Sequence, residues 1–299
     1  MNNNDLGDTL QTSAKTSFLN FFRNIFKIKF LENIIVTHTQ QKPTDAFVAK
    51  IIPNNYQYGK PTWRTATRNG INYKLDISDY MEYCIYYGLQ NEPRHILYDL
   101  AKQGQTIFDI GTNIGETLMN FARINSQGKN YGFEPVPHLY QRALQNISNN
   151  SFTNISLNNV ALSDREEVLH FHQPTLKNSG SVYMIKGDIS SPDQKVQALS
   201  LDTFVNNNSI AKIDLIKIDT EGFEYNILSG GKESINKFHP VLFVEINDSN
   251  LHRQGNSAKA LFELLISWNY KIYDAITNEQ LTASYNFENK HFDIIARYN

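Results

Sequence analysis

The sequence predicts an α/β fold of the Rossmann-like type, in which helices cover both faces of a mostly parallel sheet. One observation is the stretch TIFDIGTNIGETL at residues 106–118, where a short apolar run turns through Gly111 and Gly115 into a helical pattern. An apolar strand, a glycine-rich turn and a helix form the first unit of a nucleotide-binding α/β fold. The other observation is that strand-like and helix-like patterns alternate after this stretch, which is typical of a parallel sheet.

The chain ahead of this core predicts a tail and an appendage. Residues 1–17 are polar and are expected to be disordered, and residues 18–95 to form a smaller helical and hairpin appendage. Residues 18–35 mix bulky apolar side chains with three cations. They predict either an amphipathic helix on a membrane surface or a partner, or a helix packed on its own domain or across a homodimer. The apolar positions wrap most of the way round, which favours burial.

Two further elements are expected before the core. Residues 64–75 predict a hairpin, because Asn69-Gly70 is a strong signal for a tight turn. Residues 76–92 predict a helix with Ser78 as its N-cap and with Cys84 among its inward residues.

The remaining residues, 96–299, predict the main domain. Expected strands lie at residues 107–110, 130–133, 155–160, 215–218 and 241–245. Expected helices lie at residues 113–125, 137–146, 225–228 with 232–236, and 257–268. An antiparallel insertion is expected at about residues 165–203, because residues 167–173 and 196–201 alternate in polarity. Residues 270–275 and 291–298 predict a closing antiparallel pair.

Composition narrows the class of protein. A net charge of −2 over 299 residues gives no sign of a broad nucleic-acid surface. The single cysteine, Cys84, cannot form an intrachain disulfide and fits a reducing compartment. No run is apolar and long enough to span a membrane, and no secretory signal is visible. We therefore expect a cytoplasmic protein whose residues 18–35 are a candidate contact with the inner face of the membrane.

The spacing of the glycine turn indicates its ligand. It reads D-x-G-x-N-x-G, which is neither the dinucleotide pattern nor a P-loop, and no lysine follows Gly115. Asp109 at the end of the strand would repel a pyrophosphate, so a ligand with an amino or cationic group is expected. Glu134 ends the second strand, where an acid commonly hydrogen-bonds the hydroxyls of a ribose.

These blocks resemble the FkbM family of S-adenosylmethionine-dependent methyltransferases. The resemblance covers about half the chain, from about residue 106 to residue 247, and lies in FDIGTNIGETL, GFEPVPHLY, NNVALSD, LDTF, DLIKIDTEGFEYNILSGG and HPVLFVEIN. It implies a class I methyltransferase sheet, parallel with an antiparallel C-terminal hairpin, and S-adenosylmethionine as cofactor. The cofactor residues that it implies are Asp109, Gly111, Asn113 and Gly115 around the methionine part, Glu134 at the ribose, and Ala161 and Asp164 at the adenine.

Two of these assignments have alternatives. Asp164 would meet the adenine amino group or else cap a turn. The family usually has a tyrosine-rich segment that ends in glycine and glutamate ahead of its first strand, and Tyr87, Gly88 and Glu92 are similar to it. This segment would cover the cofactor as a lid with Glu92 binding it, or would be a packing helix with Glu92 at its solvated end.

A second polar cluster points to the chemistry. Lys217 and Asp219 alternate with isoleucines and share one face of a strand, and Glu221 follows in the turn. One hypothesis makes a carboxylate the general base, with Lys217 holding it ionised. In another, Asp219, Glu245 and Asn247 bind Mg²⁺, which would orient and acidify a sugar diol. In a third, the lysine–aspartate pair only stabilises the turn. His252, after the fifth strand, is either a base that reaches the acceptor or an exposed loop residue.

The resemblance therefore implies an O-methyltransferase that acts on a hydroxyl, and we expect a sugar in a glycan or a glycosylated natural product. Trp63 and the nearby tyrosines would stack on the sugar or else form core. The alternatives are an N- or C-methyltransferase on a small molecule and a catalytically inactive, methyltransferase-like binding module. The expected partner is a small-molecule or glycan acceptor, and not a nucleic acid.

Overall fold

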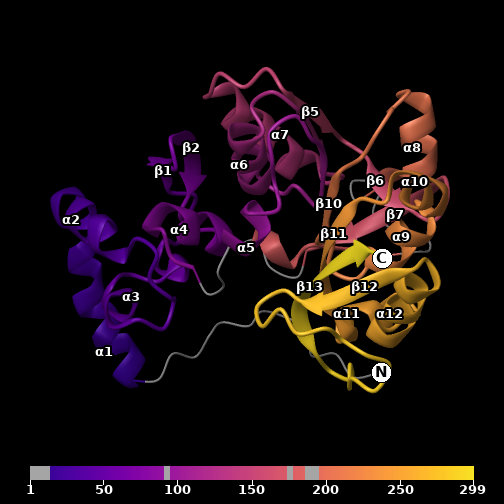
Figure 1. Cartoon of the computed structure of the whole chain (residues 1–299). Coiled ribbons are helices and arrows are strands. Elements are labelled where there is room, and N and C mark those ends of the chain that lie inside the picture. Colours follow the sequence, from indigo (N-terminus) through magenta and orange to yellow (C-terminus); the bar gives the residue numbers. More distant parts are fainter. Residues whose placement is uncertain (1–13, 91–94, 174–177, 186–194) are drawn as a thin grey trace. The chain divides into compact units, whose positions relative to one another are not determined.

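The structure, a computed structural model, describes residues 14–90, 95–173, 178–185 and 195–299 (Figure 1). The chain divides into two compact units. The first comprises the described residues of Met1–Arg64 and Leu75–Glu92, and the second those of Thr65–Lys74 and Pro93–Asn299. Within the described residues, no helix is long and apolar enough to cross a membrane.

A seven-stranded sheet forms the centre of the second unit, in the order β12-β13-β11-β10-β3-β4-β5. Its strands are β3 (Thr106–Ile110), β4 (Lys129–Phe133), β5 (Ile155–Asn158), β10 (Leu215–Ile218), β11 (Val241–Asn247), β12 (Tyr270–Asp274) and β13 (His291–Tyr298). The first five are parallel, and β13 runs antiparallel to both β11 and β12. This confirms the predicted Rossmann-like sheet with an antiparallel C-terminal hairpin.

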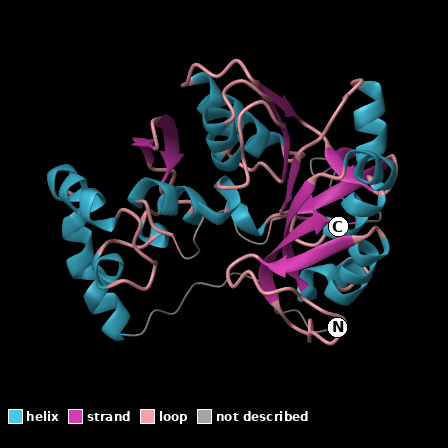
Figure 2. Cartoon of the chain, in the orientation of Figure 1, coloured by secondary structure: helices cyan, strands magenta, loops and turns pink. Residues whose placement is uncertain are grey.

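Helices cover both faces of this sheet (Figure 2). They are α5 (His95–Tyr98), α6 (Glu116–Ile124), α7 (Pro137–Ser148), α8 (Leu201–Asn207), α9 (Glu224–Ser229), α10 (Lys232–Phe238), α11 (Asp248–Arg253) and α12 (Ala258–Ser267). Short helices α8 and α11 were not predicted. The LDTF segment reads as a turn in sequence, yet it begins α8, where Ser200 caps the helix by accepting from the Thr203 N–H.

One face of the central sheet changes from apolar to polar along the parallel strands. On one face, Ile107 and Leu215 pack against Phe121 of α6. On the other, Phe108 packs against Phe133 and against Phe204 of α8. The first face is apolar at the start of the parallel strands and becomes polar toward their carboxyl ends, where the next side chains on that face are Asp109 and Lys217. Ligands of open α/β sheets bind at this carboxyl edge.

The insertion forms a second, four-stranded sheet in the order β6-β9-β7-β8. Its strands are β6 (Ala161–Ser163), β7 (Glu167–His172), β8 (Tyr183–Ile185) and β9 (Lys195–Ser200). Strands β7 and β9 pair antiparallel as the alternation of polarity predicts, whereas β6 and β9 pair parallel. Strands β6 and β8 have three residues each, which is too short to show an alternation.

The first unit is mostly helical. It contains α1 (Ala14–Arg23), a 3₁₀ helix (Asn24–Lys27), α2 (Lys29–Thr39), α3 (Phe47–Ile51), a second 3₁₀ helix (Asn55–Gln57) and α4 (Tyr80–Tyr87). The predicted single helix over residues 18–35 is thus divided into three pieces. The first two meet at Arg23, which keeps helical backbone angles, and Ile28 with extended angles separates them from α2. The first of these helices begins at Ala14, inside the expected tail, and residues 1–13 lie outside the described part of the chain.

Three of the four tyrosines of α4, Tyr83, Tyr86 and Tyr87, belong to the buried interior of this unit. Tyr86 donates to Glu32, which also accepts two hydrogen bonds from Arg64, and the hydroxyls of Tyr58 and Tyr87 lie 3.2 Å apart. Their burial explains the aromatic density of residues 76–92 without a bound sugar. The N-cap of α4 is Asp79 and not Ser78, because the Asp79 carboxylate accepts from two backbone N–H groups of the first turn.

The predicted hairpin is present as β1 (Trp63–Arg68) and β2 (Ile71–Asp76), which turn through Asn69 and Gly70 with positive φ at both residues. Residues 65–74 belong to the second unit, and not to the appendage as expected. Asn146 of α7 accepts from the Lys74 N–H at 2.9 Å, and Asn150 exchanges two hydrogen bonds with the Asn72 backbone. These contacts tie the hairpin to the main domain.

Candidate functional site

The glycine turn between β3 and α6 has the backbone that a close-approaching ligand requires. Gly111, Asn113 and Gly115 all have positive φ. A Cβ at Gly111 would lie 1.8 Å from the Asp219 carbonyl oxygen, so only glycine fits there. The N–H groups of Gly111 and Thr112 both donate to the Phe133 carbonyl oxygen, which joins the turn to the end of β4.

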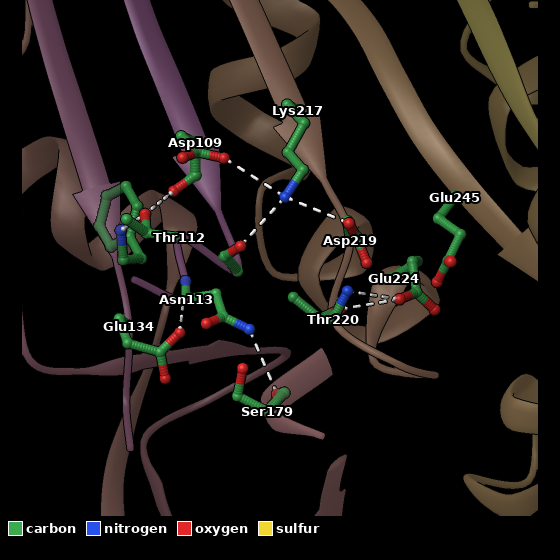
Figure 3. Close-up of polar contacts among 12 residues, drawn as sticks. Asp109, Thr112, Asn113, Glu134, Ser179, Lys217, Asp219, Thr220, Glu224 and Glu245 are labelled. Carbon is green, nitrogen blue, oxygen red and sulfur yellow. Dashed lines mark hydrogen bonds and ion pairs between the residues drawn. The ribbon is translucent and has the colours of Figure 1, made fainter. Parts of the chain in front are cut away.

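Glu134 lies beside this turn, directly after β4 (Figure 3). Its carboxylate accepts from the Asn113 N–H at 2.8 Å and from the Val136 N–H at 2.9 Å. Burial raises the pKa of Glu134 to about 7, although these hydrogen bonds favour the ionised form. Each carboxylate oxygen keeps a second lone pair, so the group can also accept from a ribose diol.

Asn113 supplies a further polar atom without a partner. Its side-chain nitrogen donates to the Ser179 carbonyl oxygen in the insertion, at 3.2 Å. Its Oδ1 atom is buried and accepts no hydrogen bond from the described residues. A buried acceptor without a donor costs free energy, so a ligand N–H or O–H placed there would stabilise the turn.

Lys217 connects the two strands at the centre of the sheet. It lies directly opposite Asp109 in the register of β10 and β3. Its Nζ atom is 3.4 Å from a carboxylate oxygen of each of Asp109 and Asp219, and it donates to the Gly111 carbonyl oxygen at 3.0 Å (Figure 3). The lysine therefore holds the shape of the glycine turn as well as the two carboxylates.

The three charges of this trio are not equally exposed. Asp109 is fully buried, Lys217 is nearly so, and the Asp219 side chain is 46% exposed. Burial raises the pKa of Asp109, against the effect of the Lys217 ammonium. Burial also opposes the charge on Lys217, yet Asp219 and Asp109 raise the lysine's pKa above its ordinary value. Lys217 thus stays charged, and Asp219 is the member of the trio that a ligand can reach.

The turn after β10 is held by a carboxylate to which the sequence analysis gave no role. Glu224 accepts through one oxygen from the Thr220 N–H and hydroxyl and from the Gly222 N–H. Glu221 has positive φ and accepts from the Asn250 side chain. Burial raises the pKa of Glu221 to about 7, and the charges of Asp219 and Glu224 add to the rise. The sequence signal was the second acid of TEGFE, which lies three residues after Glu221.

Glu245 of β11 forms a contact that the sequence analysis missed. One of its oxygens lies 2.9 Å from Nε2 of His291 at the start of β13. Burial raises the pKa of Glu245 to about 11, and Asp219, Glu221 and Glu224 contribute to the rise. His291 is separated from Glu245 by 46 residues, so only the antiparallel pairing of β11 and β13 brings them together.

The structure does not assemble the predicted cation ligands. Asn247 uses its side chain to cap α11 by accepting from the Asn250 N–H, and Glu245 contacts His291. In the described ranges, no group of three or more His, Cys, Asp and Glu side chains is arranged to hold a metal ion. The residues present therefore do not fit the expected Mg²⁺.

The other predicted residues have mixed outcomes. His252 lies on α11 with its side chain 63% exposed, 3.4 Å from Asp248. Ala161 is buried in β6, and Asp164 accepts from the Ser163 hydroxyl and from the Asn226 side chain. Glu92 lies outside the described residues, so its contact with the cofactor and the lid stay predictions.

These observations fit an adenosyl sulfonium cofactor. The glycine turn admits a ligand close to its backbone, Asn113 offers an acceptor atom, and Glu134 lies where ribose hydroxyls are expected. Asp219 offers an exposed carboxylate to an amino group. Asp109 does not, because it is fully buried and faces Lys217; its expected contact with the amino group stays a prediction.

Comparison with known proteins gives a family match. The model of the methyltransferase FkbM domain matches residues 109–272, which is more than half of the chain. Among curated proteins, the chain is 26% identical to the 2-O-methyltransferase NoeI of Sinorhizobium fredii over 58% of this chain and 76% of that protein. It is also 26% identical to the hexuronic acid methyltransferase AglP of Haloferax volcanii, over 51% of this chain and 60% of that protein.

The similarity to a solved structure is weaker than the similarity to these two sequences. The crystal structure of methyltransferase FkbM from Methylobacillus flagellatus aligns with a TM-score of 0.44 and 13% identity, over 91% of this chain and 60% of that one. The assignment to a family therefore rests on the sequence match.

Proposed function

The chain belongs to the FkbM family of methyltransferases, and from this premise we propose that it transfers a methyl group from S-adenosylmethionine to a hydroxyl of a sugar. The observation that carries the proposal is the contact of the glycine turn with Glu134, in which the Asn113 N–H lies 2.8 Å from the carboxylate. The names of the two curated relatives support the proposal, because one is a 2-O-methyltransferase and the other methylates a hexuronic acid.

Each part of the cofactor has residues suited to it. Glu134 would accept from the ribose hydroxyls, and Asn113 Oδ1 and Asp219 would accept from the methionine part. Ala161 and Asp164 would border the adenine. When bound, S-adenosylmethionine supplies a methyl group that is already activated by its sulfonium. The protein's own contribution is therefore mainly the alignment of the acceptor oxygen behind that methyl group.

Lys217 has a supporting role in this scheme. Its ammonium lies 3.4 Å from an Asp219 carboxylate oxygen and donates to the Gly111 carbonyl oxygen at 3.0 Å. Glu221 and Asp219 lie in the turn at the carboxyl edge of the sheet, where an acceptor sugar would bind. Their carboxylates can accept hydrogen bonds from its hydroxyl groups and so orient the ring.

The test is a methylation assay with a defined panel of acceptors. The purified chain would be incubated with S-adenosylmethionine and the 4-nitrophenyl glycosides of neutral sugars and hexuronic acids, and the products analysed by mass spectrometry and NMR. We expect a methyl group on a sugar oxygen. The panel would also include 4-nitrophenyl glycosides of aminohexoses, and a methyl group on their nitrogen or on a carbon would contradict O-transfer and support the N- or C-methyltransferase. Cofactor binding without transfer to any of these acceptors would support the binding module.

For the N-terminal unit we propose peripheral contact with an anionic membrane, with the chain on its cytoplasmic side. Among the described residues of this unit, eleven large apolar side chains are exposed, including Phe21, Phe30 and Phe47. Residues 18–50 carry five lysines and arginines and two acids, one of which, Glu32, is buried against Arg64. Aromatic side chains interspersed with cations bind anionic lipid surfaces. Cosedimentation of the full chain with vesicles containing phosphatidylglycerol tests this, and a homodimer without vesicle binding would contradict it.

A further inference from the structure

His291 and Glu245 form a histidine–carboxylate pair at the carboxyl edge of the sheet. Strands β11 and β13 are antiparallel, with Asn247 opposite His291 and Glu245 opposite Asp293. Glu245 and His291 are thus diagonal neighbours, a spacing that long side chains can bridge. The 2.9 Å separation of Nε2 from the carboxyl oxygen is that of a hydrogen bond.

The two members of the pair differ in exposure. The Glu245 side chain is 15% exposed, and its second oxygen is buried without a hydrogen bond from the described residues. The His291 side chain is 60% exposed, and its Nδ1 makes no hydrogen bond with those residues. A buried carboxyl group that holds one ring nitrogen leaves the other nitrogen accessible from outside, and a hydrogen-bonded carboxyl group in this position fixes the orientation of the ring.

The pair lies on the same face of the sheet as the proposed site. Lys217 is in register with Phe243 on β11, and side chains two residues apart on a strand share a face. Glu245 therefore projects from the face that carries Lys217 and Asp219. Electrostatic coupling supports this closeness, because Asp219 and Glu221 raise the pKa of Glu245 and the His291 charge lowers that of Glu221.

We propose that His291 is the general base that takes the proton of the acceptor hydroxyl and that Glu245 positions its ring. This inference rests on the proposed O-methyl transfer. As the acceptor oxygen bonds to the methyl carbon, the carbon–sulfur bond breaks and its electron pair stays on sulfur. The hydroxyl proton passes to Nδ1 of His291, and the resulting imidazolium stays paired with Glu245. The ring's exposure then lets the proton leave to water.

Four acids act electrostatically on the Glu245 member of the pair. Asp219 and Glu221 in the turn after β10, Glu224 of α9 and Asp293 of β13 all raise the pKa of Glu245. His252, the base that the sequence suggested, lies instead on α11 against Asp248, which also accepts from the backbone N–H groups of Ala258 and Asn289.

The test compares His291→Ala, Glu245→Gln and His252→Ala with the wild type, by methylation of the 4-nitrophenyl glycosides and by calorimetric titration with S-adenosylhomocysteine. We expect kcat of His291→Ala to fall about 10²- to 10⁴-fold, the range for loss of a general base. Affinity for S-adenosylhomocysteine should be retained, and added imidazole should restore part of the rate. Glu245→Gln should lower kcat less than His291→Ala does.

Other results would overturn the proposal. An unchanged kcat in His291→Ala would overturn it. A larger fall in kcat for His252→Ala than for His291→Ala would also overturn it. Loss of S-adenosylhomocysteine binding in His291→Ala would make its role structural. A wild type that binds S-adenosylhomocysteine but methylates no glycoside would contradict a base for a sugar hydroxyl. A wild type that does not bind it would overturn the proposed function, and the base with it.

Discussion

Lys217 of β10 faces Asp109 of β3 as a registered pair, with 3.4 Å between the ammonium nitrogen and a carboxylate oxygen. The same lysine reaches the carbonyl oxygen of Gly111 and the exposed carboxylate of Asp219. One buried cation thus joins the glycine turn of β3 to the polar turn of β10. The two motifs at the centre of the family resemblance are therefore parts of a single electrostatic unit.

Removal of this cation should destabilise the fold. In Lys217→Met, Asp109 would keep a buried carboxylate without its counter-ion, so we expect the free energy of unfolding to fall by about 3–5 kcal/mol in urea denaturation. Lys212→Met is the matched control, because Lys212 forms an exposed ion pair with Asp214 on the same segment. Its loss should cost at most about 1 kcal/mol. Equal losses in the two variants would contradict the role given to Lys217.

A second prediction concerns the backbone of the glycine turn. Gly111→Ala would bring a Cβ within 1.8 Å of the Asp219 carbonyl oxygen. Gly104→Ala is its control, because Gly104 also has positive φ but nothing lies within 4 Å of the added Cβ. We expect the control to lose about 1 kcal/mol from backbone strain alone. Gly111→Ala should lose clearly more stability than the control, as measured by thermal unfolding. Similar losses of stability in the two variants would show that the turn can shift to admit a side chain.

The pKa of Glu134 predicts how cofactor affinity depends on pH. Since burial raises this pKa to about 7, the carboxyl is mostly protonated at pH 6 and mostly ionised at pH 8. The ionised group is the better acceptor for ribose hydroxyls, so affinity for S-adenosylhomocysteine should rise about tenfold over this interval. Calorimetry at several pH values measures the rise. Glu134→Gln should bind S-adenosylhomocysteine more weakly, and its affinity should not change with pH over this interval. If the affinity of the variant rises with pH as steeply as that of the wild type, a group other than Glu134 causes the pH dependence.

Treatment with a chelator tests the cation hypothesis. Asn247 caps α11 and Glu245 contacts His291, so neither side chain is directed to a shared ion. We expect methyl transfer to keep its rate after dialysis against EDTA. Loss of activity on dialysis, with recovery on addition of Mg²⁺, would show that these side chains rearrange to bind the ion.

The sequence predicts those parts of the site that depend on local order. The glycine turn and Glu134 each follow a strand directly, so their position at the carboxyl edge follows from the parallel sheet. The sharing of one face by Lys217 and Asp219 follows in the same way from strand periodicity.

The other contacts of the site depend on strand pairing and on side-chain contacts between segments that are distant in the sequence. The contact of His291 with Glu245 requires β13 to lie beside β11 in one particular register. The burial of Asp109 and its ion pair with Lys217 depend on the pairing of β3 with β10, which the sequence does not display. The role of Glu224 depends on three donors of a turn whose shape only the folded backbone reveals.

The measurement that tests the central claim most directly is calorimetric titration of the full chain with S-adenosylhomocysteine, with Gly111→Ala and Gly104→Ala alongside. We predict that the wild type and Gly104→Ala bind one equivalent with similar affinity and that Gly111→Ala, in its folded state, does not bind. Absence of binding by the wild type would contradict a methyltransferase site at this turn. Undiminished binding by Gly111→Ala would place the cofactor elsewhere.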